Sequence, residues 1–416
     1  MSGPSSSAVA AGKAGLLVAF MWGAYFLNYC DRQAVFSMTG SLEEDLGMTD
    51  AQMGLVGACF LWVYAFGCPI AGQVGDRFSK RLLVVASLVI WSLVTVANGF
   101  AGTALTMLGL RAAMGISESL FMPTAVALTA NAHPPERRSR AIATLTTAQI
   151  AGTVGGSWFG GWMADRGEWR AAFFIMGAVG VLYAVPYFLF LRGVEEGTLE
   201  GSSGSGGGVP AALLAKIPTF LMLCFVFPVF VFGLWLLYGW LPTFLREKFA
   251  LTQAAAALNA TISLQATTAV GLLGGGFLAD ALYRRTKASR LWLMTASLLL
   301  SAPCLHYLGN SESLASTRAA AAGFGLFSGL LMGNIFPAAF EVVPAGARAS
   351  AVGWLNFFGA IMSGFATLFG GRWKASLGID ALLTCTSFAY LAAAVVLVLG
   401  IALVFPRDHA RAAPAA

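Results

Sequence analysis

The chain has 416 residues, of which 58% are hydrophobic and only 11% are charged, and its mean hydropathy is +0.75. Soluble globular domains carry about 25% charged residues. Too little polar surface remains to cover a water-soluble body of this size, so the composition excludes a soluble protein and predicts an integral membrane protein. The net charge of +6 and the pI of 9.1 would suit a nucleic-acid binder, and the placement of the charges tests that alternative.

Twelve apolar segments are each long enough to cross a bilayer as a helix. The hydrocarbon core is about 30 Å thick and requires about 20 apolar residues in a helix. The predicted spans are 14–38, 51–74, 82–101, 104–130, 140–163, 171–191, 218–244, 253–279, 290–309, 318–342, 347–371 and 379–405. They form two sets of six, which predicts an all-α membrane protein.

A polar segment separates the two sets of spans. It contains three glutamates, followed by a run of Gly and Ser at 201–208. This composition is typical of a flexible, solvated linker. The predicted organisation is an N-terminal six-helix bundle at 1–191, a cytoplasmic linker at 192–217 and a C-terminal six-helix bundle at 218–416.

Lysine and arginine are unevenly distributed among the loops. With the N-terminus inside, sixteen lie in inner segments and seven in outer loops. Cytoplasmic segments of membrane proteins carry an excess of these residues. The bias predicts cytoplasmic N- and C-termini, and it explains the net charge without a nucleic-acid partner.

Signals of an enzyme or a metal site are missing from the sequence. The six cysteines lie in apolar stretches and form no CxxC pair, so neither a metal site nor a disulfide framework is predicted. There is no HExxH, no GxxxxGKS and no Ser/His/Asp grouping. We therefore predict no catalysis, no metal and no cofactor.

A short motif recurs at matching places in the two halves. In each copy a glycine precedes an aspartate by four residues, and an arginine follows the aspartate by five. The motif residues are Gly72, Asp76, Arg77 and Arg81 after the second span, and Gly276, Asp280 and Arg285 after the eighth. This recurrence predicts parallel repeats related by an axis along the membrane normal.

The first copy resembles the signature loop of the major facilitator superfamily. The resemblance implies two pseudo-symmetric six-helix bundles, and it implies that the Asp and the basic residues of the loop form a latch at the inner gate. The second copy has Ala281 where Arg is usual, so an asymmetric latch is expected. Positively charged anchors of membrane topology would also account for these loops.

Four charged residues fall deep inside predicted spans, namely Asp31 and Arg32 in the first and Arg111 and Glu118 in the fourth. Unpaired, they would cost on the order of 10 kcal/mol. Counted from span centres near Leu27 and Glu118, the other three lie about 6–10 Å toward the same outer side. Arg111 and Glu118 are two turns apart and share one helix face. We therefore expect all four side chains to face one cavity of the N-terminal bundle.

The four charges sum to zero, which suggests a coupling mechanism. If Asp31 and Glu118 take up protons, the positive charges of Arg32 and Arg111 are no longer compensated, and the site favours binding of an anion. The planar guanidinium group of an arginine can hold a carboxylate through two hydrogen bonds. Loss of the protons to the cytoplasm would restore the pairing and expel the anion. The structural alternative is an Asp31–Arg111 ion pair that only fixes the first helix against the fourth.

The surroundings of these charges resemble the anion:cation symporter family, which includes sialin and bacterial hexuronate and galactonate carriers. The similarity extends over most of the chain. It rests on Asn28–Arg32 in the first span, Arg111–Glu118 with Pro123 in the fourth, Trp240–Leu245 in the seventh and Val342–Pro344 after the tenth.

This resemblance implies roles for single residues. In the sugar-acid carriers of the family, an Asp and a Glu at the positions of Asp31 and Glu118 carry protons, and the Arg at Arg32 holds the substrate carboxylate. Arg111 is expected to contribute to anion binding and to adjust the protonation of the two acids. The matching positions for contacts with sugar hydroxyls are Tyr29, Tyr64, Gln149 and Asn356. Packing aromatics and interhelical hydrogen bonds would explain these four residues equally well.

Departures from the family pattern keep other substrates open. Ser119–Pro123 stands where the family commonly has small residues and Asn-Phe-Pro, which suggests a less polar pocket. The first-span motif and the Gly75–Arg77 loop also resemble the spinster lipid exporters, which carry amphiphiles. A spinster-like lysolipid carrier and a drug/proton antiporter are therefore the alternatives within transport.

The sequence thus predicts proton-coupled symport of a small organic anion, a sugar acid or other monocarboxylate, by alternating access. Protons are the coupling ion. The expected partners are the substrate anion and the lipid bilayer, and the expected form is a monomer in the bacterial cytoplasmic (inner) membrane. A receptor or structural protein would not require titratable pairs within its spans or duplicated loops.

Overall fold

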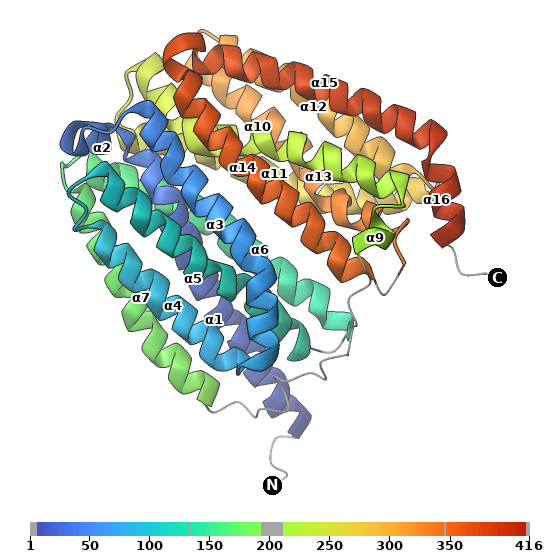
Figure 1. Ribbon diagram of the computed structural model, residues 1–416, viewed down its shortest axis with the longest axis horizontal. Coiled ribbons are helices and arrows are strands. Elements are labelled where there is room, and N and C mark those ends of the chain that lie inside the picture. Colours follow the sequence, from blue (N-terminus) through green and yellow to red (C-terminus); the bar gives the residue numbers. More distant parts are fainter. Residues whose placement is uncertain (1–5, 134, 193–210, 345–346, 413–416) are drawn as a thin grey trace. The chain divides into compact units, whose positions relative to one another are not determined.

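The computed structural model describes residues 6–133, 135–192, 211–344 and 347–412, which contain helices and no strand (Figure 1). For some positions inside helices, among them 72, 73, 75–77 and 135–140, only the backbone is described. The first half consists of α1 (Ser6–Ala34), a 3₁₀ turn (Val35–Ser37), α2 (Thr39–Leu46), α3 (Asp50–Arg77), α4 (Lys80–Asn98), α5 (Ala104–Asn131), α6 (Pro135–Ala164) and α7 (Trp169–Arg192).

The second half repeats the pattern of long helices and adds a short helix at each end. It consists of α9 (Ala211–Leu214), α10 (Pro218–Phe249), α11 (Gln253–Tyr283), α12 (Ser289–Asn310), α13 (Leu314–Phe340), α14 (Arg348–Leu377), α15 (Ile379–Leu403) and α16 (Phe405–Ala412). Among the described residues twelve helices have 19 residues or more, and each overlaps one of the twelve predicted spans, although α1 ends at Ala34 and not at 38 as predicted. The predicted helical membrane fold is confirmed.

Not all twelve helices are equally apolar. Of the described helices, nine are long and apolar enough to cross a membrane by length and composition alone. The other three long helices are α1, α5 and α6. Helices α1 and α5 hold the four charged residues singled out above, and α6 is rich in Gly and Thr.

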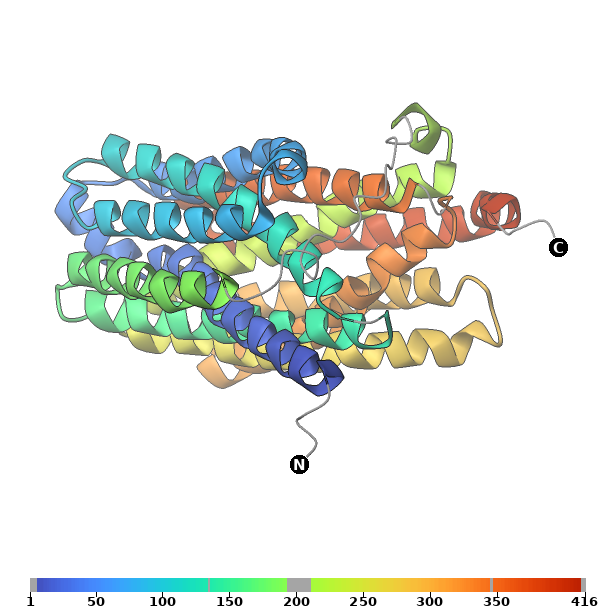
Figure 2. The ribbon, with the colours of Figure 1, turned by 90° about the horizontal axis from the view of Figure 1, so that it is seen from below.

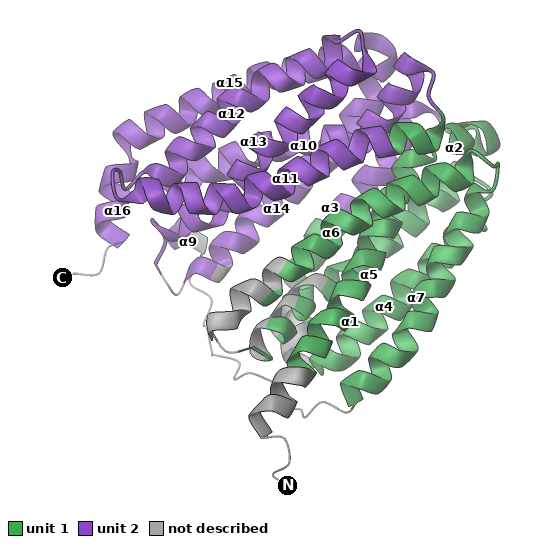
Figure 3. Cartoon of the chain, turned by 180° about the vertical axis from the view of Figure 1, so that it is seen from behind, with its two compact units in different colours: residues 1–48, 62–204, 252–257 green, residues 49–61, 205–251, 258–416 purple. Residues whose placement is uncertain are grey.

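The chain divides into two compact units, coloured separately in Figure 3. Unit 1 comprises residues 1–48, 62–204 and 252–257, and unit 2 comprises 49–61, 205–251 and 258–416. Helices α3 and α11 thus each contribute their first turns to one unit and the rest to the other. The predicted linker at 192–217 falls mostly outside the described residues, so the division at that segment stays a prediction.

Equivalent contacts recur in the two units at positions 210 residues apart. The Ser87 hydroxyl in α4 donates to the carbonyl of Ser117 in α5, and the Ser297 hydroxyl in α12 donates to the carbonyl of Phe327 in α13. The N-caps of the second helix in each of these pairs match as well. Thr103 accepts from the Thr106 amide at 3.2 Å, and Ser313 accepts from the Ser316 amide at 3.2 Å. Two copies of one helical unit explain the repetition.

The tyrosines of the sixth helix in each unit extend this correspondence. The Tyr183 hydroxyl donates to the Phe20 carbonyl at 2.9 Å, and the Tyr390 hydroxyl donates to the Phe230 carbonyl at 2.5 Å. Each hydroxyl lies over a glycine, Gly23 or Gly233, where a side chain would collide with it. The two tyrosines are 207 residues apart, whereas Phe230 follows Phe20 and Gly233 follows Gly23 by 210 positions, so the first helices of the two units correspond at a spacing of 210.

Helix α1, which carries two of the four charges, packs tightly on α6. Gly152, Gly156 and Gly160 form a stripe on α6 whose missing side chains let the α1 backbone approach. A Cβ on Gly156 would lie 2.4 Å from the Cα of Cys30. Figure 2 shows α1 in dark blue. In the same unit α4 and α7 lie side by side, which agrees with the contacts between these two helices.

We expect Gly156→Ala to destabilise unit 1 by about 1–3 kcal/mol, because the new methyl group meets backbone atoms that cannot rotate away. Gly155→Ala is the matched control, since its methyl group would lie 3.5 Å from the Phe26 ring, an ordinary contact. The measurement is the apparent melting temperature of each purified variant in detergent. Equal melting temperatures for the two variants would contradict the close α1–α6 packing.

Candidate functional site

Helix α1 ends inside the protein rather than at its surface. The helix stops at Ala34, a 3₁₀ turn follows at Val35–Ser37, and the chain re-enters a helix at Thr39. The side chains from Ala34 to Thr39 are all at most 4% exposed. Asp31 and Arg32 lie in the last turn of α1 and are 2% and 5% exposed, so the fold places two charges at a buried helix end.

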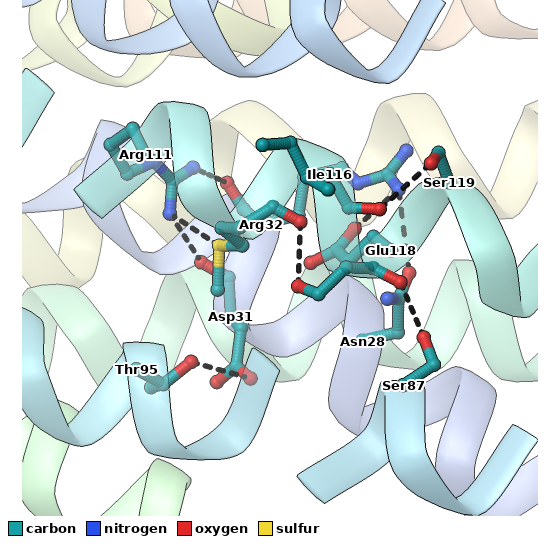
Figure 4. Close-up of polar contacts among 11 residues, drawn as sticks. Asn28, Asp31, Arg32, Ser87, Thr95, Arg111, Ile116, Glu118 and Ser119 are labelled. Carbon is teal, nitrogen blue, oxygen red and sulfur yellow. Dashed lines mark hydrogen bonds and ion pairs between the residues drawn. The ribbon is translucent and has the colours of Figure 1, made fainter. Parts of the chain in front are cut away.

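Arg32 forms an ion pair with Glu118 of α5. The Arg32 Nη2 atom lies 2.6 Å from Glu118 Oε2, and the Glu118 side chain is fully buried. The same nitrogen lies 3.4 Å from Oδ1 of Asn28, one turn back on α1 (Figure 4). A charge-assisted hydrogen bond of this length is strong, and removal of one partner would leave an uncompensated buried charge.

Two tyrosines flank the Arg32 guanidinium. Its Cζ atom lies 4.8 Å from the centre of the Tyr29 ring and 5.1 Å from the centre of the Tyr64 ring. Both distances are within the range of cation–π attraction. The predicted substrate tyrosines and the predicted anion-binding arginine therefore form one cluster.

Asp31 points away from this pair, toward α4. The Thr95 hydroxyl lies 3.1 Å from Oδ2 of Asp31 and 3.0 Å from the carbonyl of Trp91 (Figure 4). A hydroxyl can donate once and can also accept. Thr95 can therefore donate to an ionised Asp31, or it can donate to Trp91 and accept from a protonated Asp31. The contact serves either protonation state of the acid.

Arg111 of α5 contacts the backbone of α1. Its Nη1 atom lies 3.3 Å from the Asp31 carbonyl oxygen, and its Nη2 atom lies 3.2 Å from the Arg32 carbonyl oxygen. The Arg111 side chain is fully buried. All four predicted charges are thus within one buried cluster of unit 1, and Arg32 with Glu118 is the side-chain ion pair that links α1 to α5.

The remaining predicted substrate contacts are more dispersed. Gln149 is half-buried on α6 of unit 1, the helix that packs on α1. Asn356 is exposed on α14 and belongs to unit 2. Their assignment as substrate contacts stays a prediction.

The duplicated loops are described to different extents. The side chains of Gly72, Asp76 and Arg77 lie outside the described residues, whereas Arg81 Nη1 donates to the Leu191 carbonyl at the end of α7, at 3.0 Å. In the second copy, Arg285 is exposed. The gating role of these loops stays a prediction.

In the second copy Asp280 pairs with Arg290. The Arg290 Nη2 atom lies 2.7 Å from Asp280 Oδ1, and its Nε atom lies 2.9 Å from Glu341 Oε1 at the end of α13. Asn334 accepts from the same guanidinium at 3.2 Å. One arginine therefore ties together the ends of three helices of unit 2.

Five polar residues of these clusters were not among the predicted site residues, namely Asn28, Thr95, Arg290, Asn334 and Glu341. Asn28 was visible within the first-span motif, and its spacing of four from Arg32 places both on one helix face. Thr95 and Arg290 carry no comparable signal. A threonine inside an apolar span is common, and Arg290 is one of many basic residues at inner loop ends, so only the packing of α4 and α12 identifies them.

Comparisons with known proteins identify the family of the chain. The family model of the Major Facilitator Superfamily matches residues 21–367. The hexuronate transporter of Bacillus subtilis (strain 168) is 25% identical over 357 residues, 82% of this chain and 83% of its own. A probable sulfoacetate transporter of Cupriavidus necator is 30% identical over 282 residues, 64% of this chain and 65% of its own.

A solved structure shares the fold. It is the crystal structure of a bacterial homolog to the human lysosomal transporter Spinster, in an inward-facing and unoccupied conformation. It superposes with a TM-score of 0.79 over 99% of this chain and 100% of that chain, at 21% identity, which shows the fold alone. Because the family match covers most of the chain, the protein is a multi-pass membrane transporter that belongs to the Major Facilitator Superfamily.

Proposed function

We propose that the protein couples the uptake of a small organic anion to the uptake of protons. Arg32 binds the carboxylate or sulfonate of the substrate, and Asp31 and Glu118 take up and release the protons. The substrate class is a sugar acid or another small monocarboxylate or sulfonate. Both similar transporters reported above carry names of organic anions, a hexuronate and a sulfoacetate, which supports this class.

The buried Arg32–Glu118 pair is the main support for this function. Its two groups are 2.6 Å apart and nearly or fully inaccessible to water, so Arg32 cannot lose its carboxylate partner without a replacement. Protonation of Glu118 removes the negative charge and leaves Arg32 to bind an incoming anion. Deprotonation restores the competing carboxylate. Proton binding and anion binding therefore favour each other.

The surroundings of Arg32 suit a small planar acid group. Tyr29 and Tyr64 lie beside the guanidinium of Arg32, and a guanidinium can form two parallel hydrogen bonds with a carboxylate. The hydroxyl groups of these tyrosines belong to the same cluster and are candidates for hydrogen bonds with the other polar groups of the substrate. Gln149 and Asn356 are further candidate contacts, as the family resemblance implies.

The cellular setting follows the charge bias of the loops. We place the protein in a bacterial cytoplasmic (inner) membrane as a monomer, with both termini in the cytoplasm. Alternating access by the two six-helix bundles moves the substrate, with protons as the coupling ion and no cofactor. The duplicated loops, with Asp76 and Arg77 in one and Asp280 in the other, control the inner gate.

Transport in proteoliposomes tests this function directly. We expect a hexuronate, galactonate or sulfoacetate to accumulate inside vesicles when the outside is made acidic, and to stop accumulating when a protonophore collapses the gradient. Protein-free vesicles are the control. Transport of a lysolipid in place of every small acid would instead support the spinster-like alternative, and efflux of an organic cation against protons would support a drug antiporter.

We expect Glu118→Gln to abolish accumulation driven by the proton gradient while sparing counterflow exchange at equal pH. The amide cannot titrate, but it still leaves Arg32 available to the anion. Glu168→Gln, at an exposed position after α6, is the matched control and should behave as the wild type. If accumulation survives in Glu118→Gln, Glu118 is not the coupling acid.

The affinity for the anion should depend on pH in one direction. As the pH rises, Glu118 ionises and competes with the substrate for Arg32, so the half-saturating concentration in counterflow should increase. The Glu118→Gln variant should show a weaker increase, because this competitor is absent. A half-saturating concentration that falls as the pH rises in the wild type would contradict the competition.

A further inference from the structure

The buried end of α1 creates a hydrogen-bonding problem. The last four carbonyl groups of an α-helix have no partner within the helix. In α1 these groups belong to residues 31–34, and the 3₁₀ turn at Val35–Ser37, which follows directly from Ala34, supplies main-chain donors to part of this end. The side chains from Asp31 to Thr39 are at most 5% exposed. Water is thus largely excluded from these carbonyl groups, and a buried carbonyl without a donor is costly.

Arg111 donates to two of these four groups. Its Nη1 atom reaches the Asp31 carbonyl oxygen at 3.3 Å and its Nη2 atom reaches the Arg32 carbonyl oxygen at 3.2 Å. Figure 4 shows the guanidinium side-on to the end of α1, with one nitrogen directed at each of the two carbonyls. The Met114 sulfur, one turn further along α5, lies 3.2 Å from Nη1.

The geometry points to Arg111 as a positioning residue, which caps the buried C-terminal end of α1 and fixes the backbone that carries Asp31 and Arg32. It is then not a substrate ligand. The fork of a guanidinium suits this role, because two nitrogens in a fixed plane can serve two successive carbonyls. The positive charge also compensates the negative end of the helix dipole. This assignment rests on the proposed function, in which Asp31 and Arg32 are the transport groups.

Unit 2 provides an internal comparison. The residue 210 positions after Arg111 is Ala321, which cannot cap a helix end. The counterpart of Ala34 is Phe244, and there α10 continues without a break to Phe249. An arginine that donates to main-chain carbonyls is therefore present in the unit where the first helix changes to a 3₁₀ turn, and absent in the unit where the equivalent helix continues as an α-helix. A general packing role for this position would not predict that difference.

Capping explains why two buried arginines of the same cluster are not equivalent. The Nη2 atom of Arg32 contacts side-chain oxygens, one of which belongs to a titratable acid. Those contacts can be exchanged for a substrate. Both terminal nitrogens of Arg111 contact main-chain carbonyls, which do not titrate. Arg111 therefore holds the same position through the transport cycle.

Arg111→Lys and Arg32→Lys make the same chemical change at the two positions and separate the two roles. The first measurement needs no substrate and follows amide hydrogen exchange of residues 33–38 in detergent. We expect about tenfold or faster exchange in Arg111→Lys, because a carbonyl loses its donor and the helix end opens more often. Arg32→Lys should leave this exchange within about twofold of the wild type. Unchanged exchange in Arg111→Lys would overturn the assignment.

The second measurement is counterflow of the anion that the wild type transports. For Arg32→Lys we expect the half-saturating concentration to rise about tenfold or more, because a ligand of the substrate has changed. For Arg111→Lys we expect a lower maximal rate with a half-saturating concentration within about twofold of the wild type. A rise equal to that of Arg32→Lys would make Arg111 a substrate ligand and overturn the assignment.

A milder variant covers the case in which Arg111→Lys does not fold. Met114→Leu keeps the side-chain volume and removes only the sulfur that contacts Arg111. It should accelerate exchange of residues 33–38 by about two- to threefold and leave the half-saturating concentration unchanged. Exchange equal to that of the wild type would count against the cap. Since hydrogen exchange requires no substrate, failure of symport and failure of the cap are distinguishable.

Discussion

Charge neutrality in a buried site is the constraint on which unit 1 depends. Arg32 is held 2.6 Å from Glu118 where neither side chain reaches water, so each is stable only while the other, or a substitute, is present. The surrounding helices meet this constraint from several sides. Helix α1 supplies Arg32 and Asn28, α5 supplies Glu118, and α3 supplies the ring of Tyr64. Proton uptake by the acid therefore changes what the arginine must bind.

The two units share one arrangement of helices but differ in the charged residues that they contain. Their hydroxyl-to-carbonyl contacts and N-caps recur at a spacing of 210 residues. The charges do not recur. The counterparts of Asp31, Arg32, Arg111 and Glu118 in unit 2 are Leu241, Pro242, Ala321 and Ser328. In unit 2, Arg290 instead forms ion pairs at helix ends, with the exposed Asp280 and the partly buried Glu341. A single chemical site within a duplicated scaffold is the result.

The sequence was a good guide to the helices because lipid imposes a strong and simple requirement. A span must be about 20 residues long and mostly apolar, and this located all twelve long helices. Charges within such spans also stood out, because each is costly there, and so Arg32 and Glu118 were found together with Asp31 and Arg111. Helix periodicity then placed Arg111 and Glu118 on one face.

The pairing within the charge cluster could not be predicted in the same way. Counting residues along two helices gives depth to within a few ångströms, but it does not show which nitrogen meets which oxygen. The decisive detail is that α1 stops at Ala34 and a 3₁₀ turn follows, a change that no Pro or Gly marks in the sequence there. At this change from α-helix to 3₁₀ turn, Arg111 donates to the carbonyls of Asp31 and Arg32 and is thereby engaged with the backbone. Arg32 is then the arginine whose partners are side chains, so that a proton and an anion can compete for the same contact.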